Sequence, residues 1–516
     1  MPGHTTHEPH GSGIRGLSLK HIDRPQALEG RFGRLFTHAQ APAADFSDDD
    51  LWALAQAING DADVKDAPDA EESHIPAAYT YLGQFIDHDI TFDPSTFEQQ
   101  KSDPDGLVDF RTPRFDMDNV YGRGPSDQPY LYDITNLLLG EKFFIINRNP
   151  KGRDLPRAAA NAAGIRRAII GDPRNDENVI VSQLQGMMLR FHNRVAALNP
   201  AASFDDVQRK VRWHYQWIVI HDFLPRVVER GILDDISPAI ADTSKDLASN
   251  KPVLKFYHFR DAIMPVEFSV AAYRFGHSMV RPGYRVNEFT APLRIFDHLN
   301  PTNGLNAFGE FPKSWCIDWQ RFVDLGIGPH PEIDSDRVQF AYKIDTSLVE
   351  PLSELPHSVA GDEAEANPRL FSLAFRNMVR GKKLLLPSGQ DVAKAMGLTP
   401  LTDAEILIGA GQNDAPNEQD GAKKITDVSA AFAGKCPLWA YVLAEARRTL
   451  FHPPSNQALH KAQLGSVGGR IVAEVFLGLL MKDPTSFVNA PAPWVPDLGS
   501  GRTFSLADLL TIALAG

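Results

Sequence analysis

Long segments of this chain repeat apolar residues at the three- and four-residue spacing of an amphipathic helix. The pattern is clearest over residues 179–198, 211–230 and 438–450. Alternating strands and two-residue hairpins are scarce. The sequence therefore predicts a mainly α fold.

Helix ends are marked by Ser or Thr residues that stand three positions before an acidic residue, a typical capping pair. These pairs are Ser388 with Asp391, Thr402 with Glu405, and Ser505 with Asp508. We expect the first helix to end at Gly397 and the third to be the last helix of the chain. The polar stretches 358–367 and 411–423 predict surface loops.

The 516 residues contain no Ser/Gly-rich linker and no repeat period, and 43% of them are hydrophobic. This composition excludes a wholly disordered or fibrous protein. We expect a disordered tail over residues 1–16 and a single domain over residues 17–516. The histidines of that tail, His4, His7 and His10, indicate a solvated segment rather than a metal site.

Acidic residues outnumber basic ones by 65 to 52, which gives a net charge of −13. This charge argues against nucleic acid or an anionic membrane as a partner and favours small molecules. Cys316 and Cys436 form no C-x-x-C motif, so no thiolate metal site is predicted. The sequence leaves open whether one disulfide joins them. Residues 1–13 lack an apolar signal-peptide core, and the apolar run 475–481 is too short to span a bilayer. We expect a soluble bacterial protein that is cytoplasmic or exported without a recognisable signal peptide.

The segment 83–91 carries the first candidate site. On a helix, Gln84, Asp87 and His88 share one face, whereas Asp89 is turned about 100° further round. Two sites could therefore lie back to back. Taken alone, a histidine between two aspartates is more often a hydrogen-bonded structural residue.

The segment 171–178 opens the helix predicted over 179–198. Arg174 and Glu177 are i, i+3 neighbours, and on their own they indicate an intrahelical ion pair at a helix N-terminus.

Two further segments, 273–278 and 377–381, complete the set of motifs. A glycine beside His277 in an apolar helix suggests that a large group approaches the backbone closely. Alone, His277 would be a core histidine, and the 377–381 segment says almost nothing.

Together, the order and spacing of these four motifs resemble the animal-type heme peroxidase family of the peroxidase–cyclooxygenase superfamily. The resemblance runs in patches from Tyr79 to Gly478 and includes 464–475, which resembles the family's closing helix. It implies a helical fold around a buried heme b.

On the distal side of the heme, the resemblance assigns five residues. It implies that Gln84 lines the cavity, that His88 is the acid–base histidine and that Arg174 is the catalytic arginine. Asp87 and Glu177 match the carboxylates that form ester bonds to the heme.

On the proximal side, His277 matches the iron ligand and Asn377 the residue that accepts its second ring N–H. Arg274 and Arg380 match arginines near the heme and its propionates. Asn178 stands where some relatives have the methionine of a sulfonium link, so that link should be absent.

The resemblance also implies a calcium site. Its ligands are Asp89, Thr112, the carbonyl of Arg114, Asp116 and Asp118, and many relatives have serine at the last position. Three carboxylates, a hydroxyl and a carbonyl form the hard oxygen shell that calcium prefers. The alternative is a solvated acidic turn.

We therefore expect a heme peroxidase that reduces hydrogen peroxide and oxidises halide, thiocyanate or small aromatic donors, with a role in the response to oxidative stress. The residues support this expectation, because neutral imidazole titrates in the range needed to carry the peroxide proton. A fixed guanidinium stabilises the negative charge of the leaving oxygen.

Two other functions stay open. A fatty-acid dioxygenase of the same superfamily needs a radical-forming tyrosine three residues before the proximal histidine. That position is Arg274, and Tyr273 is one residue away, which on an α-helix indicates a packing role. The other alternative is a non-catalytic structural protein stabilised by calcium.

Overall fold

The computed structural model describes residues 32–60, 71–92, 109–133, 154–162, 164–297, 304–306, 308–326, 337–409, 421–449 and 463–515. The tail over residues 1–16, with His4, His7 and His10, lies outside these described residues. So does most of the loop predicted over 411–423.

Helices are the main regular structure of the described chain, and they confirm the predicted mainly α fold. The α-helices are α1 (Asp48–Ile58), α2 (Ala78–Ile90), α4 (Asp118–Tyr121), α5 (Val179–Leu198), α6 (Phe204–Ile218), α7 (Leu224–Val227), α8 (Arg230–Ile236), α9 (His357–Ala360), α10 (Glu363–Ala366), α11 (Leu373–Lys383), α12 (Gly389–Ala395), α13 (Ile425–Val428), α14 (Leu438–Thr449), α15 (Gly468–Lys482) and α16 (Leu506–Leu514). Near the site, η7 (Pro173–Asp176) and η10 (Ala272–His277) are 3₁₀-helices, and η8 (Val219–Phe223) and η9 (Glu267–Ala271) are π-helices.

The strands of the described chain are short and pair only two by two. They are β1 (Phe32–Gly33), β2 (Glu72–Pro76), β3 (Met264–Pro265), β4 (Gly283–Tyr284), β5 (Leu293–Arg294), β6 (Phe340–Tyr342), β7 (Leu407–Ile408) and β8 (Lys423–Lys424). β1 pairs with β3 in parallel, and the pairs β2–β6, β4–β5 and β7–β8 are antiparallel. These pairs fasten loops to the helical body and form no layer of their own.

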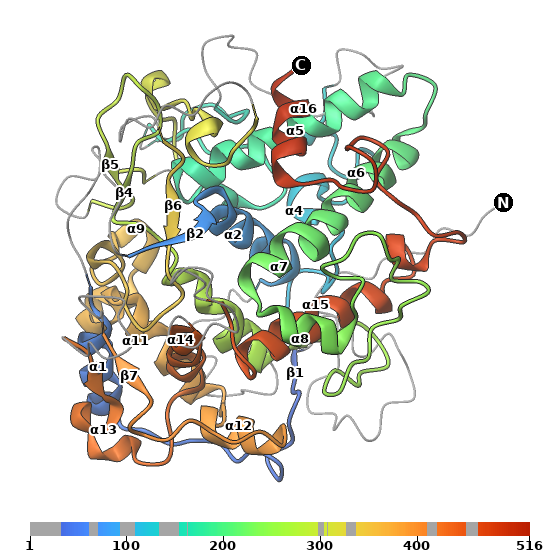
Figure 1. Ribbon diagram of the computed structural model, residues 1–516. Helices are drawn as coiled ribbons and strands as arrows, with labels where there is room; N and C mark the ends of the chain where they lie inside the picture. The colour runs from blue at the N-terminus through green and yellow to red at the C-terminus, as the bar shows by residue number, and fades with distance from the viewer. Residues whose placement is uncertain are drawn as a thin grey trace.

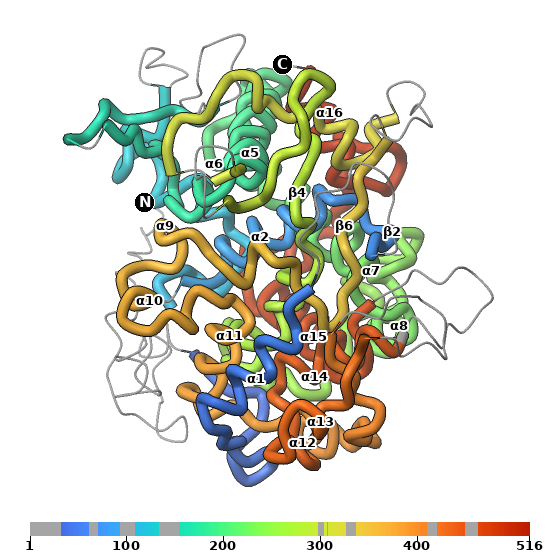
Figure 2. The backbone as a smooth tube through the Cα atoms, turned by 90° about the vertical axis from the view of Figure 1, so that its left-hand side faces the viewer, coloured from blue at the N-terminus to red at the C-terminus, as the bar shows by residue number. Residues whose placement is uncertain are grey.

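Helix α2 lies at the centre of the molecule in both views (Figures 1 and 2). It packs against α5, and α5 packs in turn against α6 and α16. On the other side of α2, η10 packs against α14 and α15. Ten of the thirteen residues of α2 are buried, so this helix is core on nearly every side.

The helix start at residue 179 follows from local chemistry. The side chain of Asn178 accepts hydrogen bonds from the backbone N–H groups of Ile180 and Val181, which lack partners inside the helix. Helix α5 therefore has the bounds that the sequence predicts. The capping box of Ser505 and Asp508 also forms and begins α16.

The helix predicted over 211–230 differs from α6 and its continuation. α6 begins earlier, at Phe204, and gives way to the π-helix η8, where the N–H of Leu224 donates to the carbonyl of Val219. Pro225 follows directly and has no N–H for a regular α-helical bond. The wider π-turn accommodates the hydrogen bond that Pro225 cannot donate, and the helix ends before Val228.

Two other local predictions need correction. Thr402 and Glu405 make the expected side-chain hydrogen bonds, but these close a turn, because the next residues pair as β7 with β8. The loop predicted over 358–367 contains the single-turn helices α9 and α10. The cap at Ser388 and the stop at Gly397, which has a φ of 74°, are confirmed around α12.

Cys316 and Cys436 are both free thiols, so no disulfide joins them. In the described part of the chain, every helix is too short or too polar to cross a membrane.

Candidate active site

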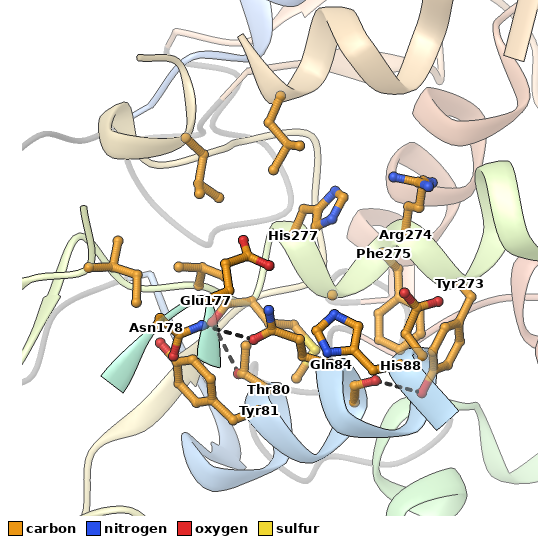
Figure 3. Close-up of a pocket in the computed structure, with 18 of the residues that line it drawn as sticks. Thr80, Tyr81, Gln84, His88, Glu177, Asn178, Tyr273, Arg274, Phe275 and His277 are labelled. Atoms are coloured by element: carbon orange, nitrogen blue, oxygen red, sulfur yellow. Dashed lines mark hydrogen bonds between the residues drawn. The ribbon is translucent and has the colours of Figure 1, made fainter. Parts of the chain in front are cut away.

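A cavity of about 260 Å³ lies between α2 and η10. The polar residues that line it include Thr80, Gln84, Asp87, His88, Glu177, Asn178, Tyr273, Arg274 and His277, together with Tyr79 and Tyr81. Figure 3 shows Gln84 and His88 on α2, with Arg274 and His277 on the η10 segment. Residues nearly 200 positions apart in the sequence thus share one site. The apolar part of the lining includes Ile295, Phe296, Leu352, Leu355 and Val359.

His88 is buried and oriented by an amide. Its Nδ1 lies 2.6 Å from Oδ1 of Asn175, and the Asn175 amide nitrogen donates to Gln185 at 2.9 Å. Asn175 therefore presents its oxygen to His88, so Nδ1 carries the proton and Nε2 is left as the basic nitrogen. Burial, reinforced by the charge of Arg174, lowers the pKa of His88 to about 4. The imidazole is therefore neutral near pH 7.

Arg174 lies beside His88 but does not line the cavity. Its guanidinium pairs with Asp172 at 2.7 Å and donates to the carbonyl oxygens of His88 at 3.0 Å and Thr91 at 2.7 Å. It also covers the ring of Phe92 at 4.5 Å. The cation is thus held at the C-terminal end of α2, whereas the sequence places it over the cavity. The sequence motif contained its buried partner, Asp172, but gave it no role.

The two carboxylates predicted to bond heme both face the cavity. Burial raises the pKa of Glu177 to about 7. Asp87 accepts a hydrogen bond from the Thr91 hydroxyl at 3.0 Å. Next to them, Asn178 donates from its side chain to Gln84 at 3.1 Å, so this amide both caps α5 and fixes Gln84.

His277 contacts Asn377 as the sequence predicts, although the amide is turned. The Asn377 nitrogen lies 2.9 Å from Nδ1 of His277, and the Asn377 oxygen accepts a hydrogen bond from Arg274 at 3.0 Å. This contact leaves Nε2 as the other ring nitrogen that could bind a metal. An imidazole bound through Nε2 carries its proton on Nδ1, so the amide must turn to accept it. Arg274 would then need another anion, such as a cofactor carboxylate.

Tyr273 faces the cavity, although the sequence predicts a packing role for it. Its ring stacks on Phe268 at 4.7 Å, and its hydroxyl donates to the carbonyl of Gly83 at 3.2 Å. The prediction assumed an α-helix, but the π-turn η9 and the 3₁₀-turn η10 change which side chains share a face. Tyr273 therefore both packs and lines the site.

Arg380 lies on α11, three residues after Asn377, and does not line the cavity. Burial, together with the charge of Arg380, lowers the pKa of the neighbouring Arg376. Arg380 is therefore on the helix that carries Asn377 but is not among the residues that line the site.

The cavity residues fit a heme. A Cβ atom added to Gly276, which is adjacent to His277, would meet no heavy atom within 4 Å, so a flat group has room to lie against this backbone. A histidine nitrogen, two carboxyl groups and an arginine are donors suited to iron, ring methyl groups and propionates. The apolar walls suit the ring itself.

Asp89 faces away from the cavity and forms an acidic cluster with Asp116 and Asp118. One oxygen from each carboxylate lies within 4.8 Å of the others. Both oxygens of the fully buried Asp89 lack a hydrogen-bond partner among the described residues. Burial and Asp116 raise the pKa of Asp118 to about 8, and burial also raises that of Asp89.

Thr112 joins the cluster by donating a hydrogen bond to Asp116 at 2.7 Å, and Arg114 lies two residues further along the same turn. Buried carboxylates without partners are costly, and a hard divalent cation would remove that cost. The donor set therefore fits calcium.

A helical fold that gathers these histidines and carboxylates around one cavity is that of the peroxidase–cyclooxygenase superfamily. The family model for animal haem peroxidase matches residues 95–415, and the chain belongs to this family. Peroxidasin of Drosophila melanogaster is 24% identical over 260 residues, which are 47% of this chain and 14% of that protein. Dual oxidase of Drosophila melanogaster is 25% identical over 129 residues, 22% of this chain and 7% of that protein. The chain thus spans a small part of the length of these relatives.

Solved structures share the fold over nearly the whole chain. Peroxidase A from Dictyostelium discoideum aligns with 94% of this chain and 93% of its own, with a TM-score of 0.55 and 16% identity. Fatty acid alpha-dioxygenase from Arabidopsis thaliana aligns with 94% of this chain and 76% of its own, with a TM-score of 0.53 and 14% identity. At such identities the likeness concerns the fold alone.

Proposed function

We propose that this protein is a heme peroxidase that reduces hydrogen peroxide and oxidises halide, thiocyanate or small aromatic donors. The observation that carries the proposal is the pairing of His88 and His277 on one cavity, each oriented by an asparagine amide. The family match also supports the proposal, because the family consists of heme oxidoreductases. The cofactor is heme b, which His277 would hold through its iron.

Heme, when bound, supplies the oxidising chemistry. His88 accepts the proton of the incoming peroxide on Nε2 and returns it to the leaving oxygen, which departs as water. The hydrogen bond to Asn175 keeps Nε2 free for this task. Arg174 pairs with Asp172 outside the cavity, so in this arrangement it would favour the negative charge of the leaving oxygen only through its charge beside His88, without contact.

The carboxyl groups of Asp87 and Glu177 would hold the heme by ester bonds to its methyl groups. Arg274 would pair with a propionate. We further propose that the acidic cluster, with Thr112 and the carbonyl of Arg114, binds one calcium ion and holds the end of α2 in place.

The experiment compares His88→Ala with the matched control His258→Ala, which changes an exposed histidine. Wild-type protein should show a Soret band that shifts when peroxide is added. General acid–base catalysis contributes about 10² to 10⁴ in rate, so His88→Ala should slow this shift by at least about 10²-fold while keeping its heme. His258→Ala should react like wild type. A near-normal rate in His88→Ala would refute the assignment.

A second candidate function is a heme-dependent fatty-acid dioxygenase, and Tyr273 is the observation that favours it. This tyrosine lines the cavity, whose lining also includes apolar side chains suited to an acyl chain. Oxygen uptake with linoleate or palmitate, and its loss in Tyr273→Phe, would support this function. Peroxide-driven bromide or iodide oxidation that persists in Tyr273→Phe would support the peroxidase.

A third candidate, a non-catalytic structural protein, predicts full calcium loading without a Soret band. The same spectrum and a metal analysis on one preparation distinguish it from both enzymes.

A further inference from the structure

Arg111 bridges the acidic cluster and the segment that begins η7. Its Nη1 pairs with Asp118 at 2.9 Å, and its Nη2 pairs with Asp172 at 2.6 Å and donates to the carbonyl of Gly171 at 3.3 Å. The Arg111 side chain is 11% exposed and that of Asp172 is 1% exposed. These pairs are therefore little screened by solvent and salt.

Asp172 is shared by two guanidinium groups. It binds Arg111 on one side, and on the other it accepts hydrogen bonds from Nε and Nη2 of Arg174. Arg174 in turn holds the carbonyl oxygens at the end of α2. Four alternating charges, Asp118, Arg111, Asp172 and Arg174, thus run from the acidic cluster to the helix that carries His88.

A divalent cation in the acidic cluster would compete with Arg111 for Asp118. It would also repel the guanidinium, which cannot lose its proton to escape the repulsion. When the cation displaces Arg111 from Asp118, Asp172 is the remaining carboxylate partner of Arg111. A tighter Arg111–Asp172 pair weakens the hold of Asp172 on Arg174.

We propose that Arg111 is a positioning residue that couples cation binding in the acidic cluster to the pairing of Arg174. The proposal rests on the calcium site of the proposed function, and it makes the position of Arg174 depend on whether that site is loaded. Linkage is reciprocal. The factor by which cation binding weakens the Arg174–Asp172 pair equals the factor by which that pair weakens cation binding.

The test measures calcium affinity directly, by competition with a fluorescent chelator, on full-length heme-loaded protein stripped of cations. Arg111→Gln should bind calcium at least about fivefold more tightly, since a competitor for Asp118 is gone. Arg111→Lys restores the charge but cannot bridge two carboxylates with a planar fork. Its affinity should return toward that of wild type.

A double-mutant cycle separates a connected relay from independent charge effects. Arg174→Gln frees Asp172 for Arg111 and should also tighten calcium binding, by at least about threefold. In the Arg111→Gln or Arg111→Lys background, Arg174→Gln should have no further effect. The control is Arg212→Gln, because Arg212 donates to the backbone carbonyl of Asp116 at 2.6 Å and touches neither Asp118 nor Asp172. In that background the effect of Arg174→Gln should persist in full.

Calcium affinity that is unchanged or weakened in Arg111→Gln would overturn the proposal, as would multiplicative effects of the Arg111 and Arg174 changes. In either case wild-type calcium binding would leave the cation site itself intact. A wild-type protein that binds no calcium would overturn both the coupling and the calcium site, whereas peroxide turnover tests the peroxidase separately.

Discussion

Gly276 provides a direct test of where the heme lies. It lines the cavity next to His277, and a Cβ at this position would point into open space. Replacement by leucine keeps an ordinary backbone conformation and extends a branched side chain into the cavity. Gly231→Leu is the matched control, because Gly231 lies on the surface helix α8 and its Cβ also meets no atom within 4 Å.

The expected change in heme affinity follows from the effects of the substitution on the apoprotein and on the heme-bound protein. Without heme, the substitution removes glycine's entropic cost in helical backbone, so the apoprotein should be as stable as wild type or up to about 1 kcal/mol more stable. With heme, the new side chain overlaps the ring, and such overpacking costs about 1 to 3 kcal/mol. Gly276→Leu should therefore bind heme about 5- to 150-fold more weakly.

Heme titration followed at the Soret band measures the affinity, and urea unfolding of the apoprotein measures the stability. Gly231→Leu should match wild type in heme affinity. If Gly276→Leu bound heme as tightly as the control while its apoprotein stayed folded, the open space beside His277 would not be the heme site. A large loss of apoprotein stability in Gly276→Leu would contradict the absence of close neighbours.

Three further outcomes follow from the site and its surroundings. Heme in wild-type protein should resist acid–acetone extraction after peroxide treatment, and the double change Asp87→Asn with Glu177→Gln should make it fully extractable. Asn377→Asp should lower the heme reduction potential in a spectroelectrochemical titration, because a carboxylate makes the His277 imidazole more anionic. Burial lowers the pKa of His214 from 6.5 to about 4, so the unfolded chain binds this proton first as the pH falls. This histidine should therefore lower the free energy of unfolding by up to about 3 kcal/mol between pH 6.5 and pH 4. Urea unfolding of His214→Gln should lack this contribution to the pH dependence.

The sequence predicted best what depends on a single helix. The i, i+3, i+4 spacing of Gln84, Asp87 and His88 placed them on one face, and they share the cavity. Asp89 is one residue further along and is therefore rotated by about 100° around the helix, away from that face. It lies beside Asp116 in the acidic cluster. Helix geometry alone fixes these relations, so no knowledge of the rest of the fold was needed.

What the sequence missed depends on contacts between segments. Asn175 and Asp172 stood inside a recognised motif without a role, yet they orient His88 and hold Arg174. Their signal was available, because a buried cation needs a carboxylate and a buried histidine needs a hydrogen-bond partner. Choosing them required knowing that η7 packs against the end of α2. Tyr273 packs on Phe268 as predicted, but its place in the cavity was missed, because α-helical geometry was assumed where the chain forms π- and 3₁₀-turns.

The cavity and the acidic cluster both include side chains of α2. His88 faces the cavity and Asp89 faces the acidic cluster, so a shift of the end of α2 moves both. Asp118 adds a third carboxylate to the acidic cluster, and Arg111 pairs with it at 2.9 Å. The guanidinium that offsets this charge also binds Asp172, the partner of Arg174. The additional carboxylate of the acidic cluster is thereby connected to Arg174, the arginine beside His88.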